Sequence, residues 1–196
     1  MYWLINTLLS VGLIVTLVAC RNGESRNRVT MYFNVDSLVT AQSMLLRGQS
    51  ATLTKVEMIN GVEEKSEINA KDSIDWETEL EMFRQLDLNR PSFVNQYDVS
   101  EGGSGDVRET FTAYQRKERE PVVWLRIYYD STDRIATIEG EYLEENALYY
   151  NERRLRLTLD QAKSQPVLHS YSIVGKQRML FSDTVRYRVE ASINIK

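Results

Sequence analysis

The stretch VRYRVEASINI, residues 185 to 195, alternates apolar and polar side chains from end to end. Successive side chains of a β-strand point to opposite faces of the sheet, so this alternation predicts a strand with one buried and one solvated face. The apolar set runs from Val185 to Ile195, and the polar set includes Arg186 and Arg188. We therefore expect a strand over residues 184–195, in a sheet that covers a core with one face.

The sequence before this strand repeats the pattern. Runs rich in Val, Ile, Leu and Tyr predict four further strands, over residues 122–129, 135–142, 148–159 and 167–174, the last extending towards residue 181. Several of the links between them are short and contain turn-forming residues such as Asp, Ser and Pro. Because short links join antiparallel neighbours, the second half of the chain predicts an antiparallel β-meander.

A helix is predicted near the start of the domain. Asp36 is placed to cap a helix over residues 37–47, and Gly48 follows at the position where a left-handed stop favours glycine. The spacing of the apolar residues predicts a core-facing stripe of Leu38, Ala41 and Leu45, widened by Met44.

A second helix is predicted from Asp72 or Asp75 to about residue 86. Its core-facing residues have the helical spacing and are Trp76, Leu80 and Phe83. Pro91 prevents the helix from continuing.

Between the two helices, Asn60-Gly61 predicts a type I′ hairpin turn, because both positions need a positive φ. It joins a strand over residues 51–59 to a return strand over residues 62–68, which is so polar that we place it at a sheet edge. After the second helix, Gly102-Gly103-Ser104-Gly105 predicts a flexible link between short strands over residues 93–99 and 109–115. A phosphate-binding loop would need a helix after the glycines.

Together these elements predict an α+β fold: two short amphipathic helices packed on a twisted, mostly antiparallel β-meander, with a strand-rich C-terminal half. We expect one domain over residues 29–196. The formal net charge is −4 at pH 7, and the acidic excess lies in residues 20–116. Neither half has the basic footprint of a nucleic-acid-binding protein, so we exclude that class of partner.

The N-terminus carries the most specific motif. Leu17-Val18-Ala19-Cys20 ends an apolar run, and Cys20 is the only cysteine of the chain. An apolar run that is closed by small residues and followed by a charged segment has the layout of a secretory signal. The four residues match a lipobox, so this region resembles the start of a bacterial lipoprotein precursor. The resemblance implies a signal peptide over residues 1–19, acylation of Cys20, which attaches it to the membrane, and a tether over residues 20–28.

The motifs FNVDSL (33–38), DWETEL (75–80) and RPSF (90–93) accompany this lipobox. With them, the chain resembles the small uncharacterised outer-membrane lipoproteins of Bacteroidota-type bacteria. The resemblance implies an outer-membrane location at the periplasmic face and carries no known activity. The inner membrane and the cell surface are the alternative locations.

A second interpretation of the N-terminus is an uncleaved membrane helix, because a span needs about 20 apolar residues. Residues 1–20 contain no Lys or Arg, whereas Arg21, Arg26 and Arg28 follow directly. By the positive-inside tendency, this arrangement would leave the domain in the cytoplasm.

Few residues suggest catalysis. His169 is the only histidine, and we expect a structural residue on the strand face of Val167 and Tyr171, since a lone histidine supplies neither a metal site nor a hydrolytic triad. Asp130-Ser131-Thr132-Asp133 lacks the ligand spacing of a calcium loop. Glu139 and Glu141 lie two apart on one strand face, as a glycosidase-type carboxylate pair would. In a meander they would face arginines, and cross-strand pairing on a solvated face explains both groups. We predict no catalytic residue, no metal and no cofactor.

A positively charged strand face is the remaining candidate site. Arginines alternate with apolar residues in three predicted strands, at Arg126, Arg154, Arg156, Arg186 and Arg188. Cross-strand pairing with glutamates explains such a face, and docking of an anionic partner such as a lipid head group or a glycan is the alternative.

The first functional hypothesis is a non-catalytic, lipid-anchored envelope module that binds or scaffolds an envelope protein, lipid or glycan. The second is a carrier that holds a lipid or an acylated protein in a concave sheet cavity. The third is an envelope enzyme, which would need a convergent polar cleft.

Overall fold

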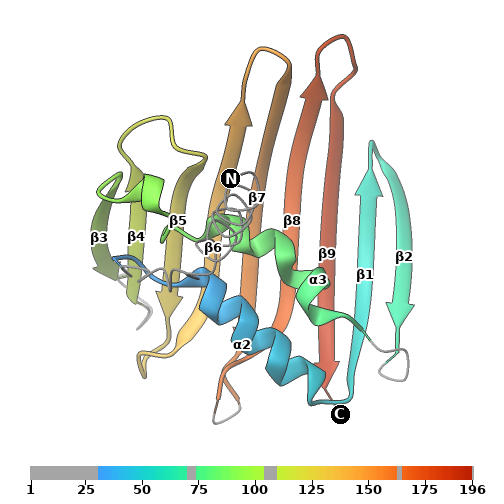
Figure 1. Cartoon of the computed structure of the whole chain (residues 1–196). Helices are drawn as coiled ribbons and strands as arrows, with labels where there is room; N and C mark the ends of the chain where they lie inside the picture. Colours follow the sequence, from blue (N-terminus) through green and yellow to red (C-terminus); the bar gives the residue numbers. More distant parts are fainter. Residues whose placement is uncertain (1–30, 70–73, 104–109, 163–164, 196) are drawn as a thin grey trace, which may run out of the picture.

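One antiparallel sheet organises the protein (Figure 1). The computed structural model describes residues 31–69, 74–103, 110–162 and 165–195. Its nine strands lie in the order β2-β1-β9-β8-β7-β6-β5-β4-β3. Their bounds are β1 Ala51–Ile59, β2 Val62–Ile68, β3 Tyr97–Gly103, β4 Thr110–Arg116, β5 Val122–Tyr129, β6 Ile135–Glu145, β7 Tyr149–Asp160, β8 Val167–Met179 and β9 Val185–Ile195. The α+β class with a mostly antiparallel sheet is confirmed.

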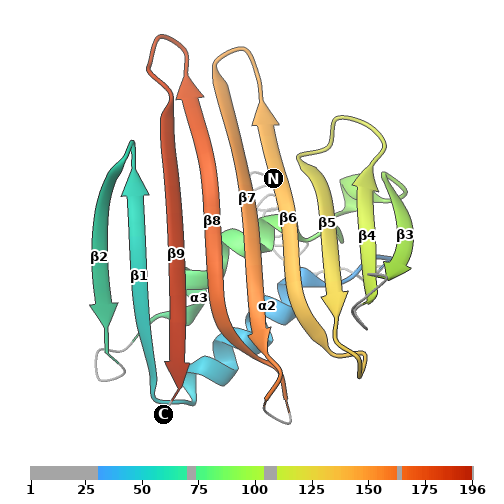
Figure 2. The ribbon, with the colours of Figure 1, turned by 180° about the vertical axis from the view of Figure 1, so that it is seen from behind.

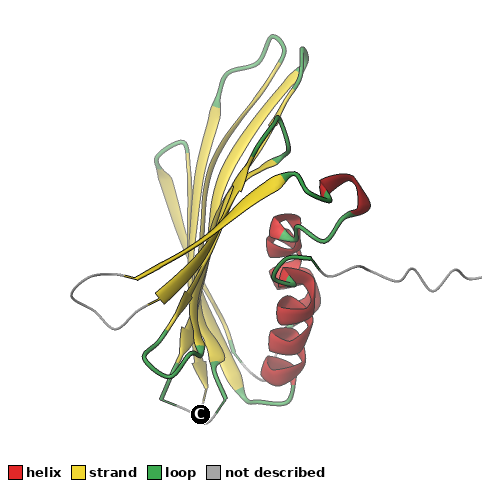
Figure 3. Cartoon of the chain, turned by 90° about the vertical axis from the view of Figure 1, so that its left-hand side faces the viewer, coloured by secondary structure: helices red, strands yellow, loops and turns green. Residues whose placement is uncertain are grey.

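The helical segments cover one face of this sheet. They are α2 (Val35–Arg47), α3 (Trp76–Leu80), and the 3₁₀ segments η1 (Glu81–Leu86) and η2 (Pro91–Phe93). Seen along the sheet, α2 and α3 form a second layer beside the strands (Figure 3). From behind, the opposite face carries no helix of the described residues (Figure 2). The core lies between the layers and includes Phe83, Leu86, Leu125, Ile138 and Leu155, all buried.

The first and the last strand of the chain lie side by side. β1 pairs with β9, so the N-terminal hairpin of β1 and β2 extends the sheet beyond the last strand of the chain. From β3 to β9 the strands follow their sequence order. β2 lies at the edge, as its polar sequence predicted, and the charges of Glu63, Glu64 and Lys65 discourage pairing with another chain.

The predicted face of α2 is wrong except at Leu38, which is half-buried and packs against the core. Asn34, not Asp36, caps the helix, and its Oδ1 accepts a hydrogen bond from Ser37 N at 2.7 Å. The buried side chains are Val35, Val39, Gln42, Ser43 and Leu46, whereas Met44 is 63% exposed.

Long-range hydrogen bonds explain the difference, because they let two polar residues of α2 enter the core. Gln42 Nε2 donates to Pro166 O at 3.1 Å, and its Oε1 accepts from Leu168 N at 2.8 Å. Ser43 Oγ donates to Trp76 O at 3.2 Å. A pattern that counts only apolar residues assigns both positions to solvent.

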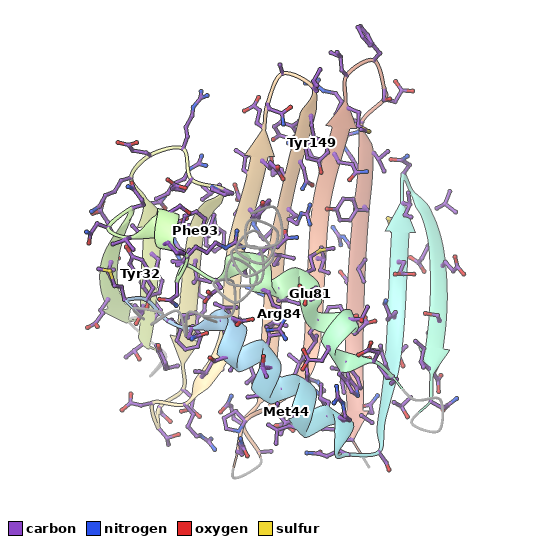
Figure 4. All side chains as sticks on the ribbon, viewed as in Figure 1. Tyr32, Met44, Glu81, Arg84, Phe93 and Tyr149 are labelled. Atoms are coloured by element: carbon purple, nitrogen blue, oxygen red, sulfur yellow. The ribbon has the colours of Figure 1, made fainter. Side chains whose placement is uncertain are left out.

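Arg84 links the helical segments (Figure 4). Its guanidinium group bonds Asp36, and its Nη1 donates to Thr40 Oγ1 at 3.0 Å, both in α2. It also pairs with Glu77 of α3 and with Glu81, the latter at 3.0 Å. Asp36 therefore serves tertiary packing instead of capping.

The second helix is shorter than predicted. α3 ends at Leu80 and continues as the 3₁₀ segment η1. Asp75 caps α3 by accepting from Thr78, whereas Asp72 lies outside the described residues. The expected burial of Trp76, Leu80 and Phe83 is confirmed.

Strand bounds near the glycines also differ from the prediction. Residues 91–93 form η2, and β3 begins only at Tyr97 and includes Gly102 and Gly103. Ser104 and Gly105, which complete the predicted loop, lie outside the described residues.

The hairpin turn has the predicted geometry, with φ 49° at Asn60 and 88° at Gly61. We expect Gly61→Ala to lower the free energy of unfolding by about 1 kcal/mol, because an L-residue is strained there although nothing lies within 4 Å of the added methyl group. Gly48→Ala is the matched control. Gly48 has φ −78°, not the predicted left-handed value, so the control should change stability little or raise it slightly. Equal losses in urea unfolding would contradict the turn geometry.

Candidate functional site

The predicted arginines lie on the sheet face opposite α2 and α3, which no described helix covers. Arg126 of β5 is exposed, whereas its neighbours Leu125 and Ile127 are buried. Arg126 is opposite Glu139, and Glu139 is opposite Arg156 of β7. Arg154 is opposite Val174, which is in turn opposite Arg188 of β9. Register therefore brings Arg126, Arg154, Arg156, Arg186 and Arg188 to one face, which we call the open face.

Glutamates accompany these arginines. Arg156 pairs with Glu139 at 2.9 Å, and Arg154 pairs with Glu141 at 3.4 Å. Arg188 pairs with Glu190 on its own strand at 3.4 Å. Cross-strand arginines thus face both glutamates of the candidate carboxylate pair. Exposed ion pairs of this kind contribute about 0.2–1 kcal/mol each, so these three pairs add little to the free energy of unfolding.

Three of the five arginines, Arg154, Arg186 and Arg188, line a groove. It has a volume of about 830 Å³ and lies over β1, β7, β8 and β9 on the open face. Its cationic lining residues are Arg154, Lys176, Arg186 and Arg188, and its acidic ones are Glu141 and Glu152. Met58 and Val174 add apolar surface. The groove therefore has an excess of two positive charges, while Arg126 and Arg156 lie outside it.

Lys176 and Glu152 form the best-defined pair of the groove, with Nζ and Oε2 3.0 Å apart. Tyr150 Oη also donates to Glu152, and this hydrogen bond, followed by that of Lys176, lowers the pKa of the carboxyl. The hydrogen bond with Glu152 raises the pKa of the Lys176 ammonium. Both groups are therefore charged at neutral pH.

Arg186 differs from the other cations of the groove. Its backbone is fixed by the hairpin turn, since Arg186 N donates to Asn60 Oδ1 at 2.9 Å and Asn60 N donates to Arg186 O at 2.8 Å. Its guanidinium has no ion pair within the part of the chain that the structure describes, and the residue is exposed. A fixed strand with a free guanidinium is suited to binding a phosphate, sulfate or carboxylate group.

Trp124 lies on the same face between two arginines. The guanidinium carbons of Arg126 and Arg154 are 5.3 and 5.6 Å from its ring centroid. Its Nε1 donates to Glu141 Oε2 at 3.2 Å. The indole therefore holds Arg154 and Glu141 at the border of the groove. Leu125 and Ile127, not Trp124, face the core.

A second cluster lies on the helix-facing side of the sheet, near the end of β7 at which Tyr149 is seen (Figure 4). Asn151 has 0% exposure, yet its side-chain nitrogen and oxygen find no hydrogen-bond partner among the described residues. Arg153 Nε is likewise buried without a partner in the described ranges. The Arg153 guanidinium lies 5.4 Å from the Tyr142 ring. Burial raises the pKa of Tyr142 and of Tyr187, which lies over Gly175.

His169 does not lie where the sequence placed it. The pairing of β7 and β8 shifts from Leu159–Leu168 to Thr158–Ser170, which leaves His169 as the extra residue of a bulge. Val167 and Leu168 are both buried, and His169 is exposed. The bulge breaks the alternation on which the predicted face depended.

The turn of residues 130–134 uses its carboxylate internally. Asp130 accepts hydrogen bonds from Thr132 and pairs with Arg134 at 2.9 Å. The Thr132 hydroxyl is the main cause that holds the pKa of Asp130 well below its usual value, with help from Arg134. Within residues 31–69, 74–103, 110–162 and 165–195, no group of three or more His, Cys, Asp or Glu is placed to hold a metal ion.

The predicted signal peptide (1–19), Cys20 and the tether (20–28) lie outside the described residues. Among the described residues, no helix is long and apolar enough to cross a membrane. Comparison with protein-family models, with curated proteins and with solved structures gave no match.

Proposed function

We propose that this protein is a lipid-anchored, non-catalytic binding module of the cell envelope, and that it binds an anionic group of its partner in the groove of the open face. The anchor is the acylated Cys20 that the lipobox predicts. The partner is an envelope protein, lipid or glycan that carries a phosphate, sulfate or carboxylate group. The outer membrane, periplasmic face, remains the proposed location.

The free guanidinium of Arg186 carries the proposal. It lies among three further cations, Arg154, Lys176 and Arg188, each of which pairs with a carboxylate. Among the described residues, Arg186 is therefore the cation of the groove whose charge no ion pair neutralises. Ionised donors make hydrogen bonds that are shorter and roughly twice as strong as neutral ones.

Arg186→Gln tests this role directly. We expect it to weaken binding of tripolyphosphate, measured by calorimetry on the full chain in detergent, by about tenfold, which equals about 1.4 kcal/mol. Arg126→Gln is the matched control, because Arg126 is an exposed arginine of the same face that lies outside the groove. The control should bind almost as wild type does, and added salt should weaken binding to wild type. Equal effects of the two substitutions would contradict the proposed site.

The second candidate function is that of a carrier for a lipid or an acylated protein. The buried polar atoms of Asn151 and Arg153 favour it, because leaving such groups without a partner costs about 1–3 kcal/mol each. A ligand head group on the helix-facing side of the sheet would satisfy them. Lipid that copurifies with the wild-type protein, and is lost in Asn151→Leu, would support the carrier over the anion-binding module.

A further inference from the structure

Two neighbouring hairpins carry four of the large apolar side chains that are exposed among the described residues. The β6–β7 and β8–β9 hairpins rise beyond the other strands at the same end of the sheet (Figure 1). Leu148 lies at the tip of the first hairpin, and Met179, Leu180 and Phe181 form the tip of the second, all exposed. Phe181 is 98% exposed. We call these four side chains the apolar tip.

The apolar tip is built as one unit. Leu180 N donates to Leu148 O at 2.8 Å, which joins the two hairpins, and Ser182 N donates to Met179 O at 3.1 Å within the second turn. Asn146 Oδ1 accepts from Leu148 N at 2.9 Å and fixes the first turn. A hollow of about 280 Å³ between the hairpins is lined by Leu148, Leu180 and Phe181.

The backbone holds Phe181 away from the protein. Phe181 has φ 62°, in the left-handed region that a bulky residue seldom adopts. Since its ring is almost wholly exposed, packing within the described chain does not explain this strain. Strained positions of this kind are maintained where the surrounding structure fixes them and are concentrated at functional sites.

The residues next to the apolar tip are of the types that are favoured at the level of lipid head groups. Tyr149 and Tyr150 are half-buried and follow Leu148 directly. Tyrosine is favoured at the level of lipid head groups, where its ring is in an apolar region and its hydroxyl group in a wet one. Arg178 precedes Met179, and Lys176 and Arg186 lie farther along the same hairpin, where they can face phosphates.

Shape favours lipid over a protein partner, because the apolar tip projects outward and a bilayer needs no matching pocket. Glu144, Glu145 and Asp183 lie near the same turns, so apolar burial rather than net charge must supply the attraction. We propose that the apolar tip inserts into the surface of a lipid bilayer. This inference does not depend on anion binding in the groove.

A fluorescent label at the tip tests the insertion. Cys20→Ser removes the only thiol of the full chain, and Phe181→Cys then accepts an environment-sensitive dye. In phosphatidylcholine vesicles, we expect the dye emission to shift to shorter wavelength and nitroxides on the lipid acyl chains to quench it. A dye at Ser131→Cys lies in the exposed β5–β6 turn at the opposite end of the sheet. Its emission should stay at the wavelength of a dye in water.

Leu148→Ser with Leu180→Ser separates insertion from mere proximity to the membrane. Both side chains are exposed, so the substitutions should leave thermal unfolding unchanged while the dye at position 181 returns to the emission of water. Retention of the shift in this variant, or equal quenching at positions 131 and 181, would overturn the proposal. So would a dye that stays in water in vesicles but is shielded by a protein in native envelopes, which would identify a protein-docking site.

Discussion

Phe83→Ala is expected to lower the free energy of unfolding by about 3–5 kcal/mol. Phe83 of η1 is fully buried. Its ring meets the Tyr171 ring of β8 edge-to-face, with centroids 5.5 Å apart. Tyr171 in turn donates to Glu79 of α3, which pairs with Lys55 of β1 at 3.1 Å. Removal of the ring leaves a cavity at the point where the helical layer is fixed to the strands.

Urea unfolding followed by circular dichroism measures this loss. Met44→Ala is the control, because Met44 was predicted to face the core but is mostly exposed. It should change the free energy of unfolding by no more than about 0.5 kcal/mol. If the two substitutions cost the same, the helical layer does not pack as described.

The second large effect concerns the groove. Replacing Arg154, Arg186 and Arg188 together with glutamine is expected to weaken tripolyphosphate binding by at least about a hundredfold, or about 2.8 kcal/mol. Lys176 would then face Glu141 and Glu152 alone, so the groove would change from an excess of positive charge to an excess of negative charge. Like charge in the groove repels the anion in addition to the loss of its hydrogen bonds.

Calorimetric titration measures this change, and thermal unfolding shows whether the variant is folded. The matched control is the double substitution Arg126→Gln with Arg156→Gln, which removes arginines from the same face outside the groove. The control should retain affinity within about threefold, or about 0.7 kcal/mol. Similar losses in the two variants would mean that the anion responds to the charge of the whole face and not to the groove.

Local sequence was sufficient for features that depend on neighbouring residues. The alternation of residues 185–195 predicted β9, whose Ala191 and Ile193 are buried while Arg186 and Arg188 are exposed. Asn60-Gly61 predicted its turn, because positive φ at two successive residues is a local requirement. The spacing of Trp76, Leu80 and Phe83 predicted their burial even though the α-helix ends at Leu80.

Features that depend on distant contacts were not predicted. Gln42 and Ser43 are buried because Pro166, Leu168 and Trp76 supply hydrogen bonds from other elements. His169 left its predicted face because of a bulge, which a regular alternation cannot reveal.

The groove itself illustrates the same limit. The arginines of the open face were identified, but their division into two groups requires the strand order. Pairing of β1 with β9 brings Met58 and Asn60 beside Arg186 and Arg188, which are far away in the sequence. Lys176 lies within the predicted extension of its strand towards residue 181, but its place beside Glu152 follows only from the pairing of β7 with β8.

Two-dimensional NMR of arginine side chains during titration with tripolyphosphate tests the central proposal most directly. We predict that the Nε–Hε resonances of Arg154, Arg186 and Arg188 shift together with one affinity, while those of Arg126 and Arg156 stay in place. Shifts confined to Arg153 on the helix-facing side, or the absence of any saturable shift, would contradict an anion-binding groove on the open face.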